Sequence, residues 1–324
     1  MAVDPDTFLP FPLLRGPHLQ TIAAAKLSLW RREPPGETQV VTLPDGDRIA
    51  LVVSTPQQWR PDDPSVVLLH GLCGCHQSSY MMRLALGLWQ RGMRAIRMNM
   101  RGCGAGVGLA RQPYHSGRSA DVLAVLEALQ RQWPQSPVTL LGFSLGGNVM
   151  LKFAGELGQQ AEELCTRVIA VCPPADLAAC SRLLGKPSNW LYERYFMRRL
   201  LAAVAERHRL FPDLAPVDLP ERLSLYQFDN LYTAPQCGFA DADDYYERSS
   251  AAPLTPHITL PCRILFAADD PVIDATVFDG LALPPNVEVV RTSKGGHLGF
   301  LGRPGQAGGY RWMDACLLDW IGTA

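Results

Sequence analysis

Short apolar segments alternate along the chain with segments that have helical periodicity. Residues 66–70 read VVLLH, a continuous apolar run typical of a strand buried on both faces. Residues 122–133 instead repeat Val, Leu and Trp at the helical period. Strands are predicted over residues 38–43, 48–54, 66–70, 94–98, 138–141, 167–172, 262–267 and 287–292, and helices over residues 78–89, 122–133, 145–157 and 310–321, with a helical piece near Val277. This order predicts an α/β fold in which helices cover both faces of a mostly parallel sheet.

The alternation stops between residues 174 and 256, where the sequence becomes aromatic, charged and irregularly helical. We therefore expect one core built from residues 1–173 and 257–324, interrupted by a helical lid over residues 174–256. The longest helix of this lid is expected over residues 189–205. Its apolar face is predicted to contain Trp190, Leu191, Phe196, Leu200, Leu201 and Val204.

Charge is unevenly distributed within the expected lid. Residues 181–211 carry seven Lys and Arg against two acidic residues, whereas residues 212–248 carry eight acidic residues against two basic ones. A basic amphipathic helix of this kind could contact an anionic membrane as a peripheral protein. The alternative, which we favour, is that its apolar side covers a pocket and that the two charge blocks partly neutralise each other.

Composition excludes several classes of protein. The 324 residues include 30 basic and 31 acidic side chains, and this balance argues against nucleic-acid binding. A hydrophobic content of 47% is too high for a disordered chain, and no apolar run approaches the ~20 residues of a transmembrane helix. Nine cysteines and an N-terminus broken by prolines, unlike a secretory signal, predict reduced thiols and a cytoplasmic protein.

A candidate nucleophile lies where a predicted strand ends and a helix begins. The segment Gly142-Phe143-Ser144-Leu145-Gly146 has the pattern G-x-S-x-G. A serine on such a turn projects its hydroxyl above the sheet, and glycines two residues to either side permit close packing of helix and strands. The alternative interpretation is a glycine-rich turn whose serine caps the helix.

The remaining groups for serine catalysis follow in chain order at the ends of the last two predicted strands. Asp269 and Asp270 come directly after residues 262–267, and His297 comes shortly after residues 287–292. Because parallel strands place their carboxyl ends at one edge of the sheet, we expect an acid and an imidazole to lie near Ser144. A serine nucleophile requires such a base and an acid that orients it.

A fourth component is expected after the strand that ends at His70. An oxyanion hole needs two backbone N–H groups, one from the residue after the nucleophile and one from an earlier loop. Leu145 and Leu72 are the expected donors. His70 itself is expected to be a structural hydrogen-bonding residue rather than a base.

Taken together, these segments resemble the α/β-hydrolase superfamily and, more narrowly, its YheT-like group of bacterial proteins, which is related to eukaryotic abhydrolase-domain proteins. The resemblance extends from about residue 9 to residue 320. Its motifs are Gly16-Pro17-His18-Leu19-Gln20-Thr21, His70-Gly71-Leu72, Asn99-Met100-Arg101-Gly102-Cys103, Gly142-Phe143-Ser144-Leu145-Gly146-Gly147-Asn148, Phe228-Asp229, Tyr232-Thr233, Gly238-Phe239, Asp244-Tyr245-Tyr246, Ala268-Asp269-Asp270-Pro271 and Gly295-Gly296-His297-Leu298-Gly299-Phe300.

The resemblance implies an α/β-hydrolase fold and a serine hydrolase of the carboxylesterase type. It implies that Ser144, Asp270 and His297 form the charge-relay triad. Related hydrolases place an aliphatic residue two positions after the acid, and Asp270 with Val272 matches this register better than Asp269 does.

The expected reaction is cleavage of a small-molecule ester through an acyl-enzyme on Ser144. An apolar lid would favour hydrophobic or acyl esters. Two alternatives stay open: acyl transfer to another acceptor through the same triad, and a non-catalytic binding protein with this fold. No metal is expected, because the cluster of Cys73, Cys75, His76 and Cys103 lacks the usual spacing of metal ligands. No cofactor is expected either, because residues 102–108 match neither a dinucleotide-binding motif nor a P-loop.

Overall fold

The computed structural model describes residues 8–26 and 32–322, and within these ranges the chain forms one eight-stranded sheet. The strands are β1 (Glu37–Thr42), β2 (Arg48–Ser54), β3 (Ser65–Leu69), β4 (Arg94–Met98), β5 (Val138–Phe143), β6 (Arg167–Val171), β7 (Cys262–Ala267) and β8 (Val287–Thr292). Their order is β1-β2-β4-β3-β5-β6-β7-β8. β2 pairs antiparallel with β1 and β4, and the pairs from β4 to β8 are parallel. The predicted α/β fold is therefore confirmed.

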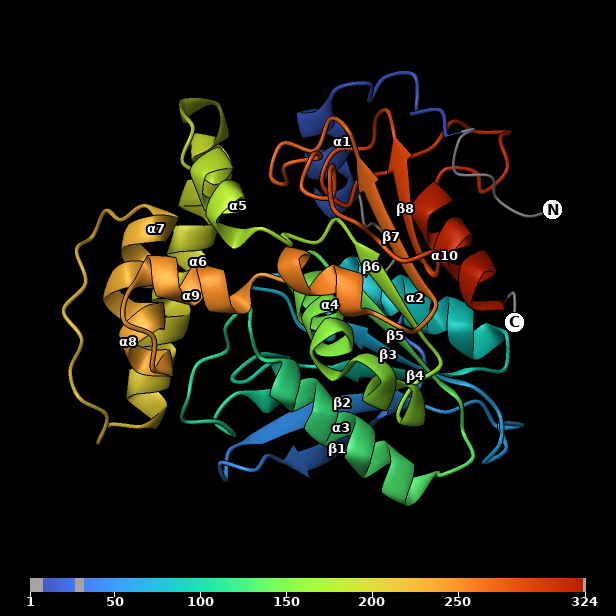
Figure 1. Ribbon diagram of the computed structural model, residues 1–324, viewed down its shortest axis with the longest axis horizontal. Helices are drawn as coiled ribbons and strands as arrows, with labels where there is room; N and C mark the ends of the chain where they lie inside the picture. Colours follow the sequence, from blue (N-terminus) through green and yellow to red (C-terminus); the bar gives the residue numbers. More distant parts are fainter. Residues whose placement is uncertain (1–7, 27–31, 323–324) are drawn as a thin grey trace.

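Helices cover both faces of this sheet (Figure 1). The helices of the core are α1 (Pro17–Lys26), α2 (Ser79–Gln90), α3 (Ser119–Gln132), α4 (Leu145–Leu157) and α10 (Trp312–Gly322), with 3₁₀ turns at Gly104–Gly106 and Gly158–Glu163. α2 packs against α10 on one face, and α3 packs against α4 on the other. No helix in the described ranges is both long enough and apolar enough to cross a membrane.

The helical piece predicted near Val277 is wrong, because residues 275–280 form turns. Asp274 Oδ1 accepts hydrogen bonds from the backbone N–H of Thr276, at 3.0 Å, and from its hydroxyl, at 2.7 Å. Such local side-chain bonds compete with helix formation, since they satisfy the backbone in a turn instead. Helix α1, in contrast, was not among the predicted helices.

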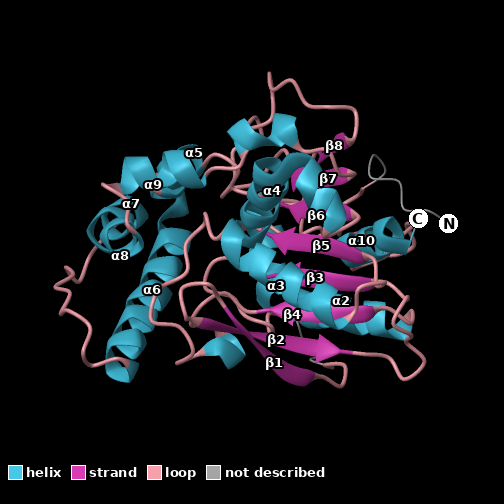
Figure 2. Cartoon of the chain, turned by 60° about the horizontal axis from the view of Figure 1, so that its bottom comes forward, coloured by secondary structure: helices cyan, strands magenta, loops and turns pink. Residues whose placement is uncertain are grey.

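Most of the segment between β6 and β7 is helical and stands beside the sheet (Figure 1). We call residues 173–261 the insertion. It contains α5 (Leu177–Leu184), α6 (Trp190–Leu210), α7 (Leu225–Phe228), a π-helical turn (Asp229–Thr233), α8 (Ala234–Cys237) and α9 (Ala242–Ser249), with 3₁₀ turns at Pro187–Asn189 and Ala252–His257. Strand β5 points towards the insertion in Figure 2, so the carboxyl end of the parallel sheet faces these helices.

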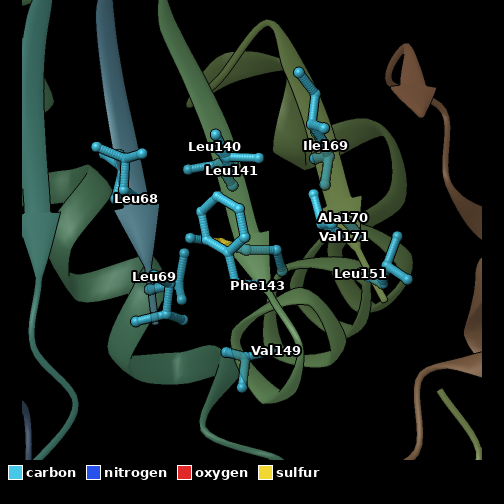
Figure 3. Packing of buried hydrophobic residues seen from close by; sticks show 14 of the residues in the cluster. Leu68, Leu69, Leu140, Leu141, Phe143, Val149, Leu151, Ile169, Ala170 and Val171 are labelled. Atoms are coloured by element: carbon cyan, nitrogen blue, oxygen red, sulfur yellow. The ribbon is translucent and has the colours of Figure 1, made fainter. Parts of the chain in front are cut away.

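The core lies between the central strands and the helices that cover them (Figure 3). Every residue of β3 and β5 is buried, as continuous apolar strands of a parallel sheet require. Phe143 at the end of β5 is fully buried beside Leu69 of β3 and Val149 of α4. This packing fixes the turn that follows Phe143, where the candidate nucleophile lies.

Candidate active site

Ser144 occupies the turn between β5 and α4. Its backbone has φ 50° and ψ −123°, a conformation that non-glycine residues adopt rarely and at an energetic cost. The Ser144 N–H donates to the carbonyl of Val171 at 2.8 Å, which ties the turn to β6. The side chain makes no capping bond to α4, so the alternative in which this serine serves as a helix cap is wrong.

Two glycines make this turn possible by letting backbone segments approach each other. A Cβ on Gly142 would lie 2.3 Å from the carbonyl oxygen of Gly146, and a Cβ on Gly146 would lie 2.4 Å from that of Leu69. Both distances are far shorter than a van der Waals contact, and the obstacles are backbone atoms that cannot move aside. The glycines of the G-x-S-x-G pattern are therefore required for steric reasons.

The three predicted triad side chains lie in one line of hydrogen-bonding contacts. His297 Nε2 is 3.0 Å from Ser144 Oγ, and His297 Nδ1 is 2.9 Å from Asp270 Oδ2. The other carboxylate oxygen of Asp270 accepts from the N–H groups of Val272, at 2.8 Å, and Ile273, at 3.0 Å. These bonds hold the carboxylate in place, and its side chain has no exposed surface.

Asp269 has a different position from its neighbour. Its carboxylate accepts a hydrogen bond of 2.9 Å from the backbone N–H of Gly296, next to His297 in the chain. Burial raises the pKa of Asp269 above its ordinary value. The structure thus brings Asp270 to the imidazole, whereas Asp269 holds the loop that carries it.

The loop with His297 is also anchored by helix α1, far away in the sequence. The His297 N–H donates to Thr21 Oγ1 at 2.9 Å. Gln20, on the same helix α1, is fully buried; its amide donates to the carbonyl of Leu301 at 3.1 Å and accepts from the Leu301 N–H at 2.7 Å. The sequence alone indicates no role for Thr21 or Gln20. Their one signal is that the segment Gly16-Pro17-His18-Leu19-Gln20-Thr21 belongs to the motifs of the resemblance.

The loop after β3 lies directly against the candidate nucleophile. A Cβ on Gly71 would be 3.0 Å from the Cβ of Ser144, so the backbone before Leu72 passes close to the serine. The Gly71 N–H donates to the hydroxyl of Tyr80 at 3.0 Å, which fixes this approach. Leu72 and Leu145, the expected oxyanion donors, both line the cavity that contains Ser144.

His70 is a structural residue, as predicted. Its Nδ1 lies 2.8 Å from the carbonyl of Gly71, and its Nε2 accepts from the Met100 N–H at 3.1 Å. Burial lowers the pKa of this histidine from 6.5 to about 4, so the ring is neutral near pH 7. A neutral ring with both nitrogens occupied supports the loop that carries Leu72.

Because the folded pKa of His70 is depressed, the unfolded chain binds a proton at this residue before the folded chain does. Stability is therefore expected to fall as the pH drops from 6.5 to about 4, by at most about 3 kcal/mol from this group. Urea unfolding as a function of pH measures this loss, which should be smaller in His70→Gln. The same substitution at exposed His257 serves as control; an unchanged pH dependence in His70→Gln would refute the assignment.

A cavity of about 440 Å³ contains Ser144 and extends under the insertion. The loop of Gly102 and Cys103 lines one side. Apolar side chains of the insertion line the other side, namely Phe196, Leu200, Val204, Leu210, Phe211 and Phe228.

Two details of the predicted lid need correction. Trp190 and Leu191 are 53% and 56% exposed and do not line the cavity. Helix α6 extends to Leu210, and the residues that line the cavity come from its later turns.

The two charge blocks of the lid also do not pair directly. Within the described residues, the ion pairs of the insertion join Arg209 to Glu206, Arg248 to Asp244, and Asp213 to Arg111 of the core.

Cys172, Asp270 and His297 bring a sulfur, a carboxylate oxygen and a ring nitrogen within 4.8 Å of one another, a grouping that could hold a metal ion. Burial, reinforced by the charge of Asp270, raises the pKa of the Cys172 thiol well above its ordinary value. Metals bind the thiolate rather than the thiol, and both ring nitrogens of His297 already face protein partners. The donor set therefore fits a hydrogen-bonded relay better than a metal site.

Comparison with known proteins agrees with this architecture. Residues 64–304 match the family model described as the alpha/beta hydrolase fold. YheT of Escherichia coli strain K12, named as a candidate esterase, is 33% identical over 98% of this chain and 93% of its own length. Human phospholipase ABHD3 is 29% identical over 83% of this chain and 68% of its own, and the monoacylglycerol lipase of Saccharomyces cerevisiae is 27% identical over 75% and 58%.

Solved structures show the same fold at lower sequence identity. The 2,6-dihydroxy-pseudo-oxynicotine hydrolase superimposes with a TM-score of 0.58 and 20% identity, covering 94% of this chain and 70% of the other. The esterase Pf2001 of Pyrococcus furiosus gives a TM-score of 0.54 and 17% identity, with coverage of 82% and 85%.

Proposed function

Because the chain belongs to the α/β-hydrolase family and to its YheT-like group, we propose that it is a serine esterase that cleaves hydrophobic or acyl esters. One observation carries the proposal: the imidazole of His297 bridges Ser144 Oγ, at 3.0 Å, and Asp270 Oδ2, at 2.9 Å. This is the arrangement in which a serine hydroxyl can lose its proton while it attacks a carbonyl.

In the proposed reaction, Ser144 Oγ attacks the ester carbonyl carbon as its proton moves to His297 Nε2. Asp270 accepts the hydrogen bond from Nδ1–H, keeps the ring in the productive tautomer and stabilises the imidazolium. The tetrahedral intermediate then expels the alcohol, which takes the proton from His297. Water, deprotonated by the same histidine, cleaves the acyl-enzyme and releases the carboxylic acid.

The charge that develops on the carbonyl oxygen needs donors close to the serine. The N–H groups of Leu145 and Leu72 are proposed for this role, because both residues line the cavity beside Ser144. In other hydrolases one such donor contributes on the order of 3–4 kcal/mol of transition-state stabilisation. The amide of Leu145 also begins helix α4, whose N-terminus favours negative charge.

A hydrophobic ester is the substrate class that the cavity supports, because apolar side chains of the insertion roof it. We propose that residues 174–256, which make up most of the insertion, are the lid expected from the sequence. The names of two relatives, a phospholipase and a monoacylglycerol lipase, agree with an acyl-ester substrate. Acyl transfer would use the same acyl-enzyme and differ only in the acceptor.

Labelling with a fluorophosphonate tests the nucleophile. We expect the folded protein to incorporate one label on the peptide that contains Ser144, and hydrolysis of p-nitrophenyl esters to yield the free acid. A folded protein that takes up no label would favour the non-catalytic binding protein. If an alcohol is added and its ester forms in place of the free acid, the result favours the acyltransferase.

The roof of the cavity should determine preference for acyl length. Leu200 of α6 is buried and lines the cavity, so Leu200→Ala removes apolar contact with a long acyl chain. Loss of about 1 kcal/mol of contact corresponds to an increase in KM for p-nitrophenyl octanoate of about fivefold, with little change for the acetate. Leu191→Ala, on the exposed side of the same helix, is the control. Equal changes for both esters would argue against the insertion as an acyl-binding lid.

A further inference from the structure

An exposed apolar surface lies where α1 meets the first turns of α6. Leu19 and Ile22 of α1 are 54% and 44% exposed. Trp190, Leu191 and Tyr195 of α6 are 53%, 56% and 44% exposed. We call these five residues the α1–α6 surface. Large apolar side chains gathered in this way on a protein surface mark an interaction site.

One side-chain contact joins the two helices. The ring of His18 on α1 stacks on that of Tyr192 on α6 with centroids 5.7 Å apart, and His18 Nδ1 is 3.0 Å from the Tyr192 hydroxyl. Ile22 follows His18 by one helical turn, and Tyr195 follows Tyr192 by almost one. Residues spaced in this way share a helix face, so Ile22 and Tyr195 lie on the same helix faces as the two rings in contact.

The charge around the α1–α6 surface is strongly positive. Residues 12–26 and 182–199 together carry seven Lys and Arg against one acidic residue, Glu193. Because the whole chain has a net charge of −1, its remainder carries −7. Arg15, Arg194 and Arg198 are exposed within these segments. The segments that form the α1–α6 surface therefore combine exposed arginines with exposed apolar side chains.

We propose that the α1–α6 surface docks on an anionic lipid bilayer. Trp190 and Leu191 enter the interface between headgroups and acyl chains, and the surrounding arginines contact the anionic headgroups. Both features strengthen interfacial binding of an amphipathic helix. A second copy of this chain is a poorer occupant, because a symmetric contact would bring the two basic regions together.

Docking there would place the reactive groups next to the lipid. Thr21 of α1 accepts the hydrogen bond from the His297 N–H, and His18 of the same helix contacts Tyr192 of α6. Helix α1, which carries Leu19 and Ile22 of the α1–α6 surface, therefore also contacts the loop that carries the imidazole. One part of the inference rests on the proposed function, namely that hydrophobic esters reach the cavity from the membrane.

Co-sedimentation of the full chain with vesicles tests the docking. We expect binding to phosphatidylcholine vesicles that contain phosphatidylglycerol, weaker binding to phosphatidylcholine alone, and loss of binding at high sodium chloride concentration. Failure to sediment with the anionic vesicles at low salt overturns the proposal. So does a dimer in sedimentation analysis that dissociates on substitution of Trp190 and Leu191, because it identifies the surface as a protein–protein contact.

Paired variants separate the apolar from the charged contribution. Trp190→Ser with Leu191→Ser should abolish most vesicle binding, whereas Tyr226→Ser with Leu231→Ser, similarly exposed at 42% and 46% elsewhere on the insertion, should not. Arg194→Gln with Arg198→Gln should weaken binding to anionic vesicles about 30-fold, since each basic residue near such a surface contributes about fivefold. Equal binding by both serine pairs would refute the assigned surface. Hydrolysis of p-nitrophenyl acetate should be unchanged in all three, so a failure of docking is distinguishable from a failure of the esterase proposal.

Discussion

Ser144→Ala should lower kcat/KM for a p-nitrophenyl ester by ~10⁴-fold or more. The substitution removes the oxygen that lies 3.0 Å from His297 Nε2 and leaves the rest of the site in place. The fold should be unaffected for two reasons. The serine side chain makes no capping bond to α4, and alanine keeps the Cβ against which Gly71 packs. Steady-state kinetics with the purified variant, together with its circular dichroism, measure both effects.

A second serine in the same cavity provides the matched control. Ser181 lines the cavity but bonds to the hydroxyl of Tyr246, at 3.1 Å, rather than to His297. Ser181→Ala should change turnover by less than about tenfold, within the range of ordinary contact losses. Comparable losses in the two variants would show that the reaction does not proceed through Ser144.

Asp270→Asn should lower kcat by ~10⁴-fold, the size of the effect known for the equivalent change in another serine hydrolase. An amide can donate where the carboxylate accepts, so the ring of His297 would turn to the tautomer that cannot take the serine proton. The bond of 2.9 Å between Nδ1 and Asp270 Oδ2 is the contact affected. Stopped-flow or steady-state assays at a single pH are sufficient to measure this loss.

The neighbouring residue is an unusually close control. Asp269 accepts one hydrogen bond, from the Gly296 N–H at 2.9 Å, and the amide oxygen of asparagine can accept the same bond. Asp269→Asn should therefore keep activity within about tenfold of the wild type. If the two variants lost activity equally, Asp270 would not be the acid that orients the imidazole.

Much of this arrangement could be predicted from the sequence, because its signals are local. Ser144 lies in a five-residue pattern between an apolar run and a predicted helix. His297 follows shortly after the predicted strand over residues 287–292. Parallel strands bring such ends to one edge of the sheet, so chain order alone predicts that the residues meet. The preference for Asp270 over Asp269 came from the resemblance instead, because related hydrolases place an aliphatic residue two positions after the acid.

The parts that could not be predicted depend on contacts between distant segments. Nothing near Gln20 indicates that its amide is buried against Leu301, 281 residues away. Helical periodicity in the insertion identified an apolar stripe but not which part of it faces the cavity. Trp190 and Leu191 fit the stripe as well as Leu200 does, yet only the tertiary packing buries Leu200.

The anchoring of the His297 loop by α1 has a consequence for biosynthesis. The backbone N–H of His297 donates to Thr21, 276 residues earlier in the chain, so two segments far apart in the sequence meet beside the imidazole. Both segments must therefore be synthesised before this contact can form, so the loop that carries His297 cannot be anchored early in synthesis.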